Sequence, residues 1–180
     1  MTLLQLIKRL SYREGDFTLS SGQKSEFYVD LKAATLHPQC VAKLAQAMFE
    51  LLKKEGVQVD AVGGMTLGAD PLATALSLHA YMQGVLWPAF IVRKEPKGHG
   101  TSQFIEGTEN LLPQSKVVIL EDVVTTGASS LKAIERVRQA GYQPVAVVSI
   151  VDRGAGGKEA FKAAGVPYFH ITTLEDLQKA

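Results

Sequence analysis

Two adjacent carboxylates and a run of small hydroxyl residues form the part of this sequence best equipped for chemistry. Glu121 and Asp122 are separated by two residues from Thr125-Thr126-Gly127-Ala128-Ser129. Carboxylates accept hydrogen bonds from sugar hydroxyls and coordinate hard cations such as Mg²⁺. A loop of small residues lets backbone N–H groups converge on an anion, and Gly127 lacks the Cβ that would keep a phosphate away. The segment therefore favours a sugar phosphate as its ligand.

The residues on either side predict how this segment is held. Residues 117–120 are consecutive apolar residues, typical of a strand buried on both faces of a parallel sheet. Residues 130–141 repeat apolar residues at helical spacing, so a helix should follow whose N-terminus adds partial positive charge. Neighbours in a strand point to opposite faces, so we expect the strand to end before Glu121 if both carboxylates reach one ligand. The alternative is a strand, turn and helix with solvated acids.

The remaining chain alternates between strand and helix patterns, which predicts an α/β fold with an open, mainly parallel twisted sheet flanked by helices. A short helix over 3–10 and a hairpin with strands at 17–19 and 27–31 precede this alternation, and we place them as a small N-terminal hood. Strands are expected at 60–64, 87–92, 104–107, 144–151 and 168–172, and helices at 38–55, 72–81 and 158–164, with a last helix capped by Thr173.

Composition narrows the class of protein further. The 180 residues predict one domain, 1–180. Lys plus Arg (19) nearly balance Asp plus Glu (18), so no global field favours nucleic acid or an anionic membrane as a partner. The single Cys40 fits a buried apolar role in a reducing compartment, and the N-terminus lacks an export pattern. We therefore expect a cytoplasmic protein.

The central segment resembles the phosphoribosyl-diphosphate (PRPP) signature of the type I phosphoribosyltransferases: apolar strand, two acids, two apolar residues, Thr, small residue, Gly, small residue, Ser or Thr. The resemblance implies that fold, with Mg²⁺ as cofactor, held through PRPP. No protein ligand of the metal is assigned directly, and Asp122 is the candidate. It also implies that the turn at 65–71 binds the pyrophosphate half of PRPP, although the Lys of many relatives is absent there. The implied PRPP contacts in the central segment are Glu121, Asp122, Val123, Val124, Thr125, Thr126, Gly127, Ala128 and Ser129.

A basic segment, 93–103, follows the strand at 87–92. Such a charged loop can simply be solvated, but departing pyrophosphate carries several negative charges, which a mobile cationic loop would stabilise. The pattern Arg-Lys-Glu-x-Lys-x-His-Gly resembles the catalytic loop of orotate phosphoribosyltransferases. That resemblance implies that Arg93, Lys94, Lys97 and His99 bind PRPP, that Lys97 and His99 act in catalysis with Glu121 and Asp122, and that the loop completes the neighbouring subunit's site in a homodimer.

Two further segments resemble that family. The hairpin, mainly within a hood of 1–36, carries a Leu-x-Ser-Gly-x-Lys-Ser-x-Phe pattern, which implies that Lys24, Phe27 and Tyr28 lie beside orotate. On spacing alone the hairpin would be structural. Arg153 follows a buried strand, and its guanidinium suits a carboxylate or a pyrimidine edge. An ion pair between Asp152 and Arg153 is the alternative, whereas the family places an orotate-binding Arg in this context, together with Thr125.

The resemblance implies an enzyme that transfers the phosphoribosyl group of PRPP to orotate, giving orotidine 5′-monophosphate and pyrophosphate in pyrimidine (UMP) biosynthesis. Two rivals stay open. A purine phosphoribosyltransferase would share the fold, but the basic loop and the hairpin pattern argue against it. A PRPP-sensing regulator would need a nucleic-acid surface or a further domain, which neutral charge and modest length do not favour.

Overall fold

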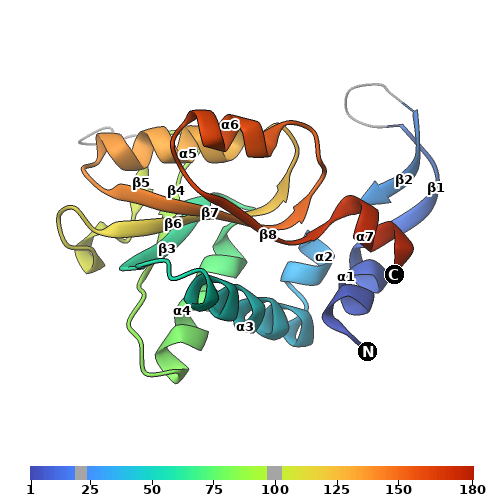
Figure 1. The fold of residues 1–180 in the computed structure, drawn as a ribbon, viewed down its shortest axis with the longest axis horizontal. Coiled ribbons are helices and arrows are strands. Elements are labelled where there is room, and N and C mark those ends of the chain that lie inside the picture. Colours follow the sequence, from blue (N-terminus) through green and yellow to red (C-terminus); the bar gives the residue numbers. More distant parts are fainter. Residues whose placement is uncertain (19–23, 97–102) are drawn as a thin grey trace.

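The computed structural model describes residues 1–18, 24–96 and 103–180 and shows a six-stranded sheet between two layers of helices (Figure 1). The strand order is β5-β4-β3-β6-β7-β8, with β5 antiparallel to β4 and the other neighbours parallel. This confirms the predicted α/β class. The strands are β3 (Ala61–Met65), β4 (Ala89–Val92), β5 (Ile105–Glu106), β6 (Lys116–Val124), β7 (Gln143–Asp152) and β8 (Tyr168–Thr173).

Strand β6 is the centre of the sheet, and it runs further than the sequence predicted. It pairs with β3 only as far as Gly63 opposite Ile119, but with β7 as far as Val124 opposite Asp152. The expectation that the strand ends before Glu121 was wrong, because β7 extends alongside it and continues the ladder of hydrogen bonds. Glu121 and Asp122 therefore lie on a part of β6 that lies alongside β7 but is no longer paired with β3.

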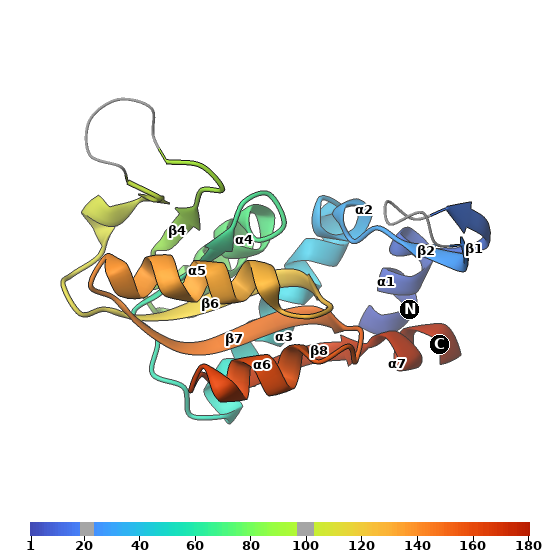
Figure 2. The same ribbon diagram turned by 90° about the horizontal axis from the view of Figure 1, so that it is seen from above.

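Alternate residues of β6 enter two different cores. Val118 and Leu120 face the core beneath α3 (Pro38–Lys54) and α4 (Asp70–Met82). Val117 and Ile119 face the core beneath α5 (Ala128–Gln139) and α6 (Gly157–Ala163). Figures 1 and 2 show these helix pairs on opposite faces of the sheet. Burial on both faces explains the unbroken apolar run.

The two ends of the chain pack together beside the sheet (Figure 1). Helix α1 (Leu3–Ser11) begins with a capping box from Thr2, and α7 (Leu174–Lys179) begins with one from Thr173, as predicted. Lys8 Nζ donates to the carbonyl oxygen of Gln178 across 2.8 Å. None of the helices formed by the described residues is long and apolar enough to cross a membrane.

The N-terminal hairpin forms a separate two-stranded sheet from β1 (Tyr12–Thr18) and β2 (Lys24–Val29). The turn predicted around residues 21–22 lies outside the described residues. The hairpin stands beyond the carboxyl end of β6, where α5 begins (Figures 1 and 2). Two short elements were not predicted, α2 (Lys32–Thr35) and the 3₁₀ turn η1 (Thr108–Asn110).

Cys40 is fully buried in α3, as predicted for a small apolar residue. Burial raises the pKa of its thiol to about 11. The thiolate is the reactive form of cysteine, so this residue is inert near neutral pH.

Candidate functional site

Both predicted carboxylates line one cavity at the carboxyl end of β6. The cavity has a volume of about 200 Å³. It joins the acids to the turn after β3, to the start of α5 and to two lysines. Its lining residues are Lys32, Met65, Thr66, Leu67, Gly68, Lys94, Glu121, Asp122 and Ser129.

Glu121 is held by the helix that follows the loop. Its side chain is buried, and Oε2 accepts a hydrogen bond of 2.9 Å from Ser130 Oγ. Burial, and next the negative charge of Asp122, raise the pKa of Glu121 to about 7, while the bond from Ser130 opposes that shift. Buried carboxyl groups beside another carboxylate are typical of functional sites.

The loop at 125–129 forms a second cavity, of about 120 Å³, that also reaches Glu121. Gly127 precedes α5 in the left-handed conformation, with φ 80°. A Cβ at Gly127 would lie 2.8 Å from Phe161 Cζ, so packing and the left-handed backbone both demand glycine here. The predicted approach of a phosphate to Gly127 stays a prediction. The first N–H groups of α5 have no acceptor within the helix, so the cavity can bind an anion.

The turn after β3 packs directly against Asp122. A Cβ at Gly68 would lie 2.8 Å from Asp122 Oδ1, so any larger residue would displace the carboxylate from its present position. Thr66 Oγ1 donates to Asp70 Oδ2 across 2.7 Å, which closes the turn at the start of α4. The site thus brings together two loops that follow neighbouring strands β3 and β6.

Two lysines give the cavity positive charge. Lys94, predicted as a PRPP contact, lines it from the segment after β4, and Lys32 lines it from α2. Sequence reasoning missed Lys32. The signal was its place directly after the aromatic hairpin strand, but nothing in the sequence showed that α2 would lie opposite the turn after β3.

The other predicted cations are arranged differently. Arg93 Nη1 forms an ion pair of 2.9 Å with Glu106 Oε1, so its guanidinium joins the start of the basic segment to β5, which follows the segment. Lys97 and His99 lie outside the described residues. Arg153 is exposed at the end of β7, and its backbone N–H donates to Val124 O across 2.9 Å. The alternative for Arg153 was an ion pair with Asp152, but Asp152 accepts from Gly154 N–H and lies 3.8 Å from His170 Nδ1.

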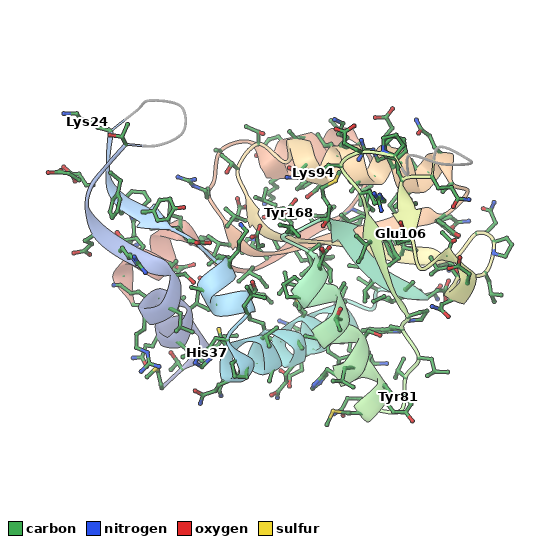
Figure 3. All side chains as sticks on the ribbon, turned by 180° about the vertical axis from the view of Figure 1, so that it is seen from behind. Lys24, His37, Tyr81, Lys94, Glu106 and Tyr168 are labelled. Carbon is green, nitrogen blue, oxygen red and sulfur yellow. The ribbon has the colours of Figure 1, made fainter. Side chains whose placement is uncertain are left out.

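The predicted orotate contacts of the hairpin lie apart from this cavity. Lys24 stands near the far tip of the hairpin, well away from Lys94 (Figure 3). Phe27 stacks on Tyr12 and Tyr28 packs on Phe17, each with ring centroids 5.6 Å apart. The structure does not bring these residues to the acidic pair, and their role stays a prediction.

The assembled site is an anion-binding loop, a pair of carboxylates and two lysines in series. That order suits a ligand with a ribose between two phosphate groups. Comparison with known proteins defines the class: residues 32–170 match the family model for the phosphoribosyl transferase domain.

Individual relatives narrow the class. The chain is 48% identical to the orotate phosphoribosyltransferase of Nostoc sp. over 98% of its own length and 84% of that protein. A crystal structure of the Mycobacterium tuberculosis orotate phosphoribosyltransferase superposes with a TM-score of 0.87 at 42% identity, covering 97% of this chain and 96% of that one. The same enzyme in complex with PRPP gives a TM-score of 0.82 at 39% identity, covering 98% and 96%. The chain therefore belongs to the orotate phosphoribosyltransferase family.

Proposed function

We propose a route by which this site carries out the family's reaction. The enzyme transfers the phosphoribosyl group of PRPP to orotate, giving orotidine 5′-monophosphate and pyrophosphate in pyrimidine (UMP) biosynthesis. One observation carries the route: a single cavity joins Glu121 and Asp122 to Ser129 on the phosphate side and to Lys32 and Lys94 on the other.

The loop at 125–129 binds the 5′-phosphate through its N–H groups and hydroxyls. Glu121 and Asp122 accept hydrogen bonds from the ribose hydroxyls. The bond from the anomeric carbon to pyrophosphate breaks, and the leaving oxygen keeps the electron pair. A ring nitrogen of the orotate anion supplies the pair for the new carbon–nitrogen bond. The two carboxylates stabilise the positive charge that develops on the ribose between these events.

The leaving pyrophosphate needs cations, and the cavity supplies Lys32 and Lys94. We assign Arg93, Lys97 and His99 to the same task, with Lys97 and His99 as the predicted catalytic residues of the basic segment. Supporting this, Arg93 and Lys94 begin that segment at the edge of the site. The turn at 66–68 faces the same ligand with backbone groups.

Mg²⁺ fits this donor set as a partner of PRPP. Among the described residues no three His, Cys, Asp or Glu side chains gather as a metal cage. Mg²⁺ commonly uses one or two carboxylates and completes its shell with water and substrate phosphates. Asp122, with Glu121 beside it, would hold the ion. When bound, it offsets charge on the pyrophosphate.

Orotate must approach the anomeric carbon from the side opposite the leaving group. Thr125 and Arg153 stand at the adjacent ends of β6 and β7, where Arg153 N–H bonds Val124 O. The exposed guanidinium suits the orotate carboxylate. The hairpin residues Lys24, Phe27 and Tyr28 complete the predicted orotate contacts.

We further propose a homodimer built on the outer face of α4. Large apolar side chains are exposed there, and Tyr81 extends from the end of α4 away from the sheet (Figure 3). All of them except Met82 line one or both of two cavities, of about 910 and 650 Å³, which share Thr74 and Leu78. Leu67 lies at one end of this face and belongs to the site turn, so a second copy would adjoin the site. The exposed side chains are Leu36, Leu67, Leu78, Tyr81, Met82, Leu86 and Leu112.

The single domain over 1–180, its 1–36 hood and the cytoplasmic location stay predictions. The central experiment follows orotate consumption by absorbance with PRPP and Mg²⁺, beside adenine, hypoxanthine and uracil. Turnover of orotate alone is expected. Turnover of a purine would overturn the specificity, and PRPP binding without turnover of any base would favour the regulator.

A further inference from the structure

Arg136 contacts three separate segments from the last turn of α5. Its Nη2 donates to Lys94 O across 3.0 Å, and its Nη1 donates to Arg93 O. The guanidinium carbon lies 4.0 Å from the centroid of the Phe104 ring. Nη1 also lies 3.7 Å from Met65 Sδ. One side chain thus engages two carbonyls, an aromatic face and a thioether.

These partners have a common location. Met65 ends β3 and leads into the turn that packs on Asp122. Arg93 and Lys94 follow β4, and Phe104 precedes β5. Arg136 therefore touches the start and the end of the basic segment and the base of the turn after β3.

The start and end of the segment are also joined to each other. Arg93 N–H donates to Phe104 O across 2.7 Å, and its side chain pairs with Glu106. Figure 3 shows Lys94 and Glu106 on the same side of the molecule. Arg136 fastens this joined pair to the body of the protein, because α5 packs on the sheet through Ala133, Ile134 and Val137.

Helix geometry links Arg136 to the site itself. Ser129 precedes it by seven residues, or about two helical turns, so the two share one face of α5. Ser129 and Lys94 line the same cavity. A planar guanidinium that binds two successive carbonyls and stacks on a ring fixes the backbone in a way that a lysine ammonium cannot.

We propose that Arg136 is a positioning residue for PRPP. It fixes the backbone at Arg93 and Lys94, so that the Lys94 side chain enters the cavity beside Asp122. The inference rests on the proposed function, since it gives Lys94 a role in binding PRPP. Arg136 itself touches no substrate.

The test compares Arg136→Ala and Arg136→Lys with a control on the same helix, Arg138→Ala. Arg138 Nη2 donates to Ala164 O across 2.9 Å, so its removal also deletes an arginine-to-carbonyl bond, but far from the cavity. PRPP affinity is measured by calorimetry, and kcat and the KM values for PRPP and orotate by absorbance. Thermal unfolding detects general damage.

We expect both Arg136 variants to weaken PRPP binding and lower kcat/KM for PRPP by roughly tenfold to a hundredfold, as a small misplacement of a binding group does. The KM for orotate and the Tm should match those of Arg138→Ala. In a double-mutant cycle, Arg136→Ala should add little once Lys94 is alanine, because both changes remove the same contribution.

Three results for the variants would overturn the proposal. PRPP affinity equal to that of Arg138→Ala would remove any positioning role. Full rescue by lysine would mean that charge alone matters, and additivity with Lys94→Ala would mean that Arg136 acts elsewhere. Calorimetry with PRPP needs no turnover, so an enzyme inactive toward orotate still shows whether Arg136 supports PRPP binding. A wild-type chain that binds no PRPP would refute the proposed function, and this inference with it.

Discussion

Ser130 Oγ donates a hydrogen bond of 2.9 Å to Glu121 Oε2, and both residues are buried. The bond joins the strand before the phosphate loop to the helix after it. The loop is therefore closed at its base by two side chains, one of which belongs to the acidic pair. A change at Ser130 should reach the ribose through Glu121.

Ser130→Ala should shift the pH dependence of catalysis. Burial and the charge of Asp122 raise the pKa of Glu121 to about 7, although the bond from Ser130 lowers it. Its loss raises that pKa further, and the acidic limb of kcat/KM for PRPP should move to higher pH by up to about one unit. Ser149→Ala is the control, since Ser149 is an equally buried hydroxyl bonded to Tyr168 OH, 2.7 Å away. An unchanged profile would show that Glu121 does not need to ionise.

Glu121→Gln should make the protein more stable at high pH while impairing activity. The pKa of Glu121 is 4.5 in its ordinary state and about 7 in the fold, so the folded protein holds the proton more tightly. The stabilisation that comes from protonated Glu121 is fully present below the lower pKa, and it is lost as the pH rises through the higher pKa. The variant should melt about a few degrees above wild type at pH 8 and level with it near pH 4. The exposed Glu109→Gln serves as control. A Tm difference between Glu121→Gln and wild type that stays constant from pH 4 to pH 8 would contradict the raised pKa of Glu121.

Gly127→Ala and Gly141→Ala form a matched pair. Both glycines have positive φ, 80° and 85°, but a Cβ meets Phe161 only at Gly127, with nothing within 4 Å at Gly141. Gly141→Ala should reduce the free energy of unfolding by about 1 kcal/mol and leave the KM for PRPP unchanged. Gly127→Ala should lose more stability and raise that KM, because the phosphate loop must shift. Equal effects would leave Gly127 with a conformational role alone.

Lys32→Ala should raise the KM for PRPP by about tenfold to a hundredfold, since a charged contact to phosphate contributes about 1.5–3 kcal/mol. Lys54→Ala removes an exposed lysine from the end of α3 and should have no such effect. Steady-state kinetics with PRPP varied provides the measurement. A normal KM for Lys32→Ala would exclude this lysine from the PRPP site.

The dimer proposal predicts that Tyr81→Glu together with Leu78→Asp gives a monomer by sedimentation, with activity strongly reduced.

A loop that is shared between the subunits makes a sharper prediction. Mixing inactive Lys97→Ala and Asp122→Asn subunits should restore about a quarter of wild-type activity, because half the dimers then carry one intact site. Restoration would be absent if each loop serves its own subunit, and a monomeric wild type would refute the dimer.

The sequence by itself determined the class of fold and the acidic phosphate loop. The unbroken apolar run of β6, the periodic helices and the cap at Thr173 are local signals, and local geometry responds to them directly. The order of acids, hydroxyls and glycine sufficed to predict a sugar phosphate, because these groups lie within one short stretch of chain.

Tertiary structure decided which residues from other parts of the chain contact that stretch. β6 continues past Glu121 because β7 runs beside it, and Gly127 is glycine because Phe161 of α6 packs against it. Lys32 reaches the cavity from α2, and Arg136 binds carbonyls more than forty positions earlier in the chain. Contacts between segments so far apart in the sequence depend on how the helices pack across the sheet. The spacing of residues along the chain does not predict this packing.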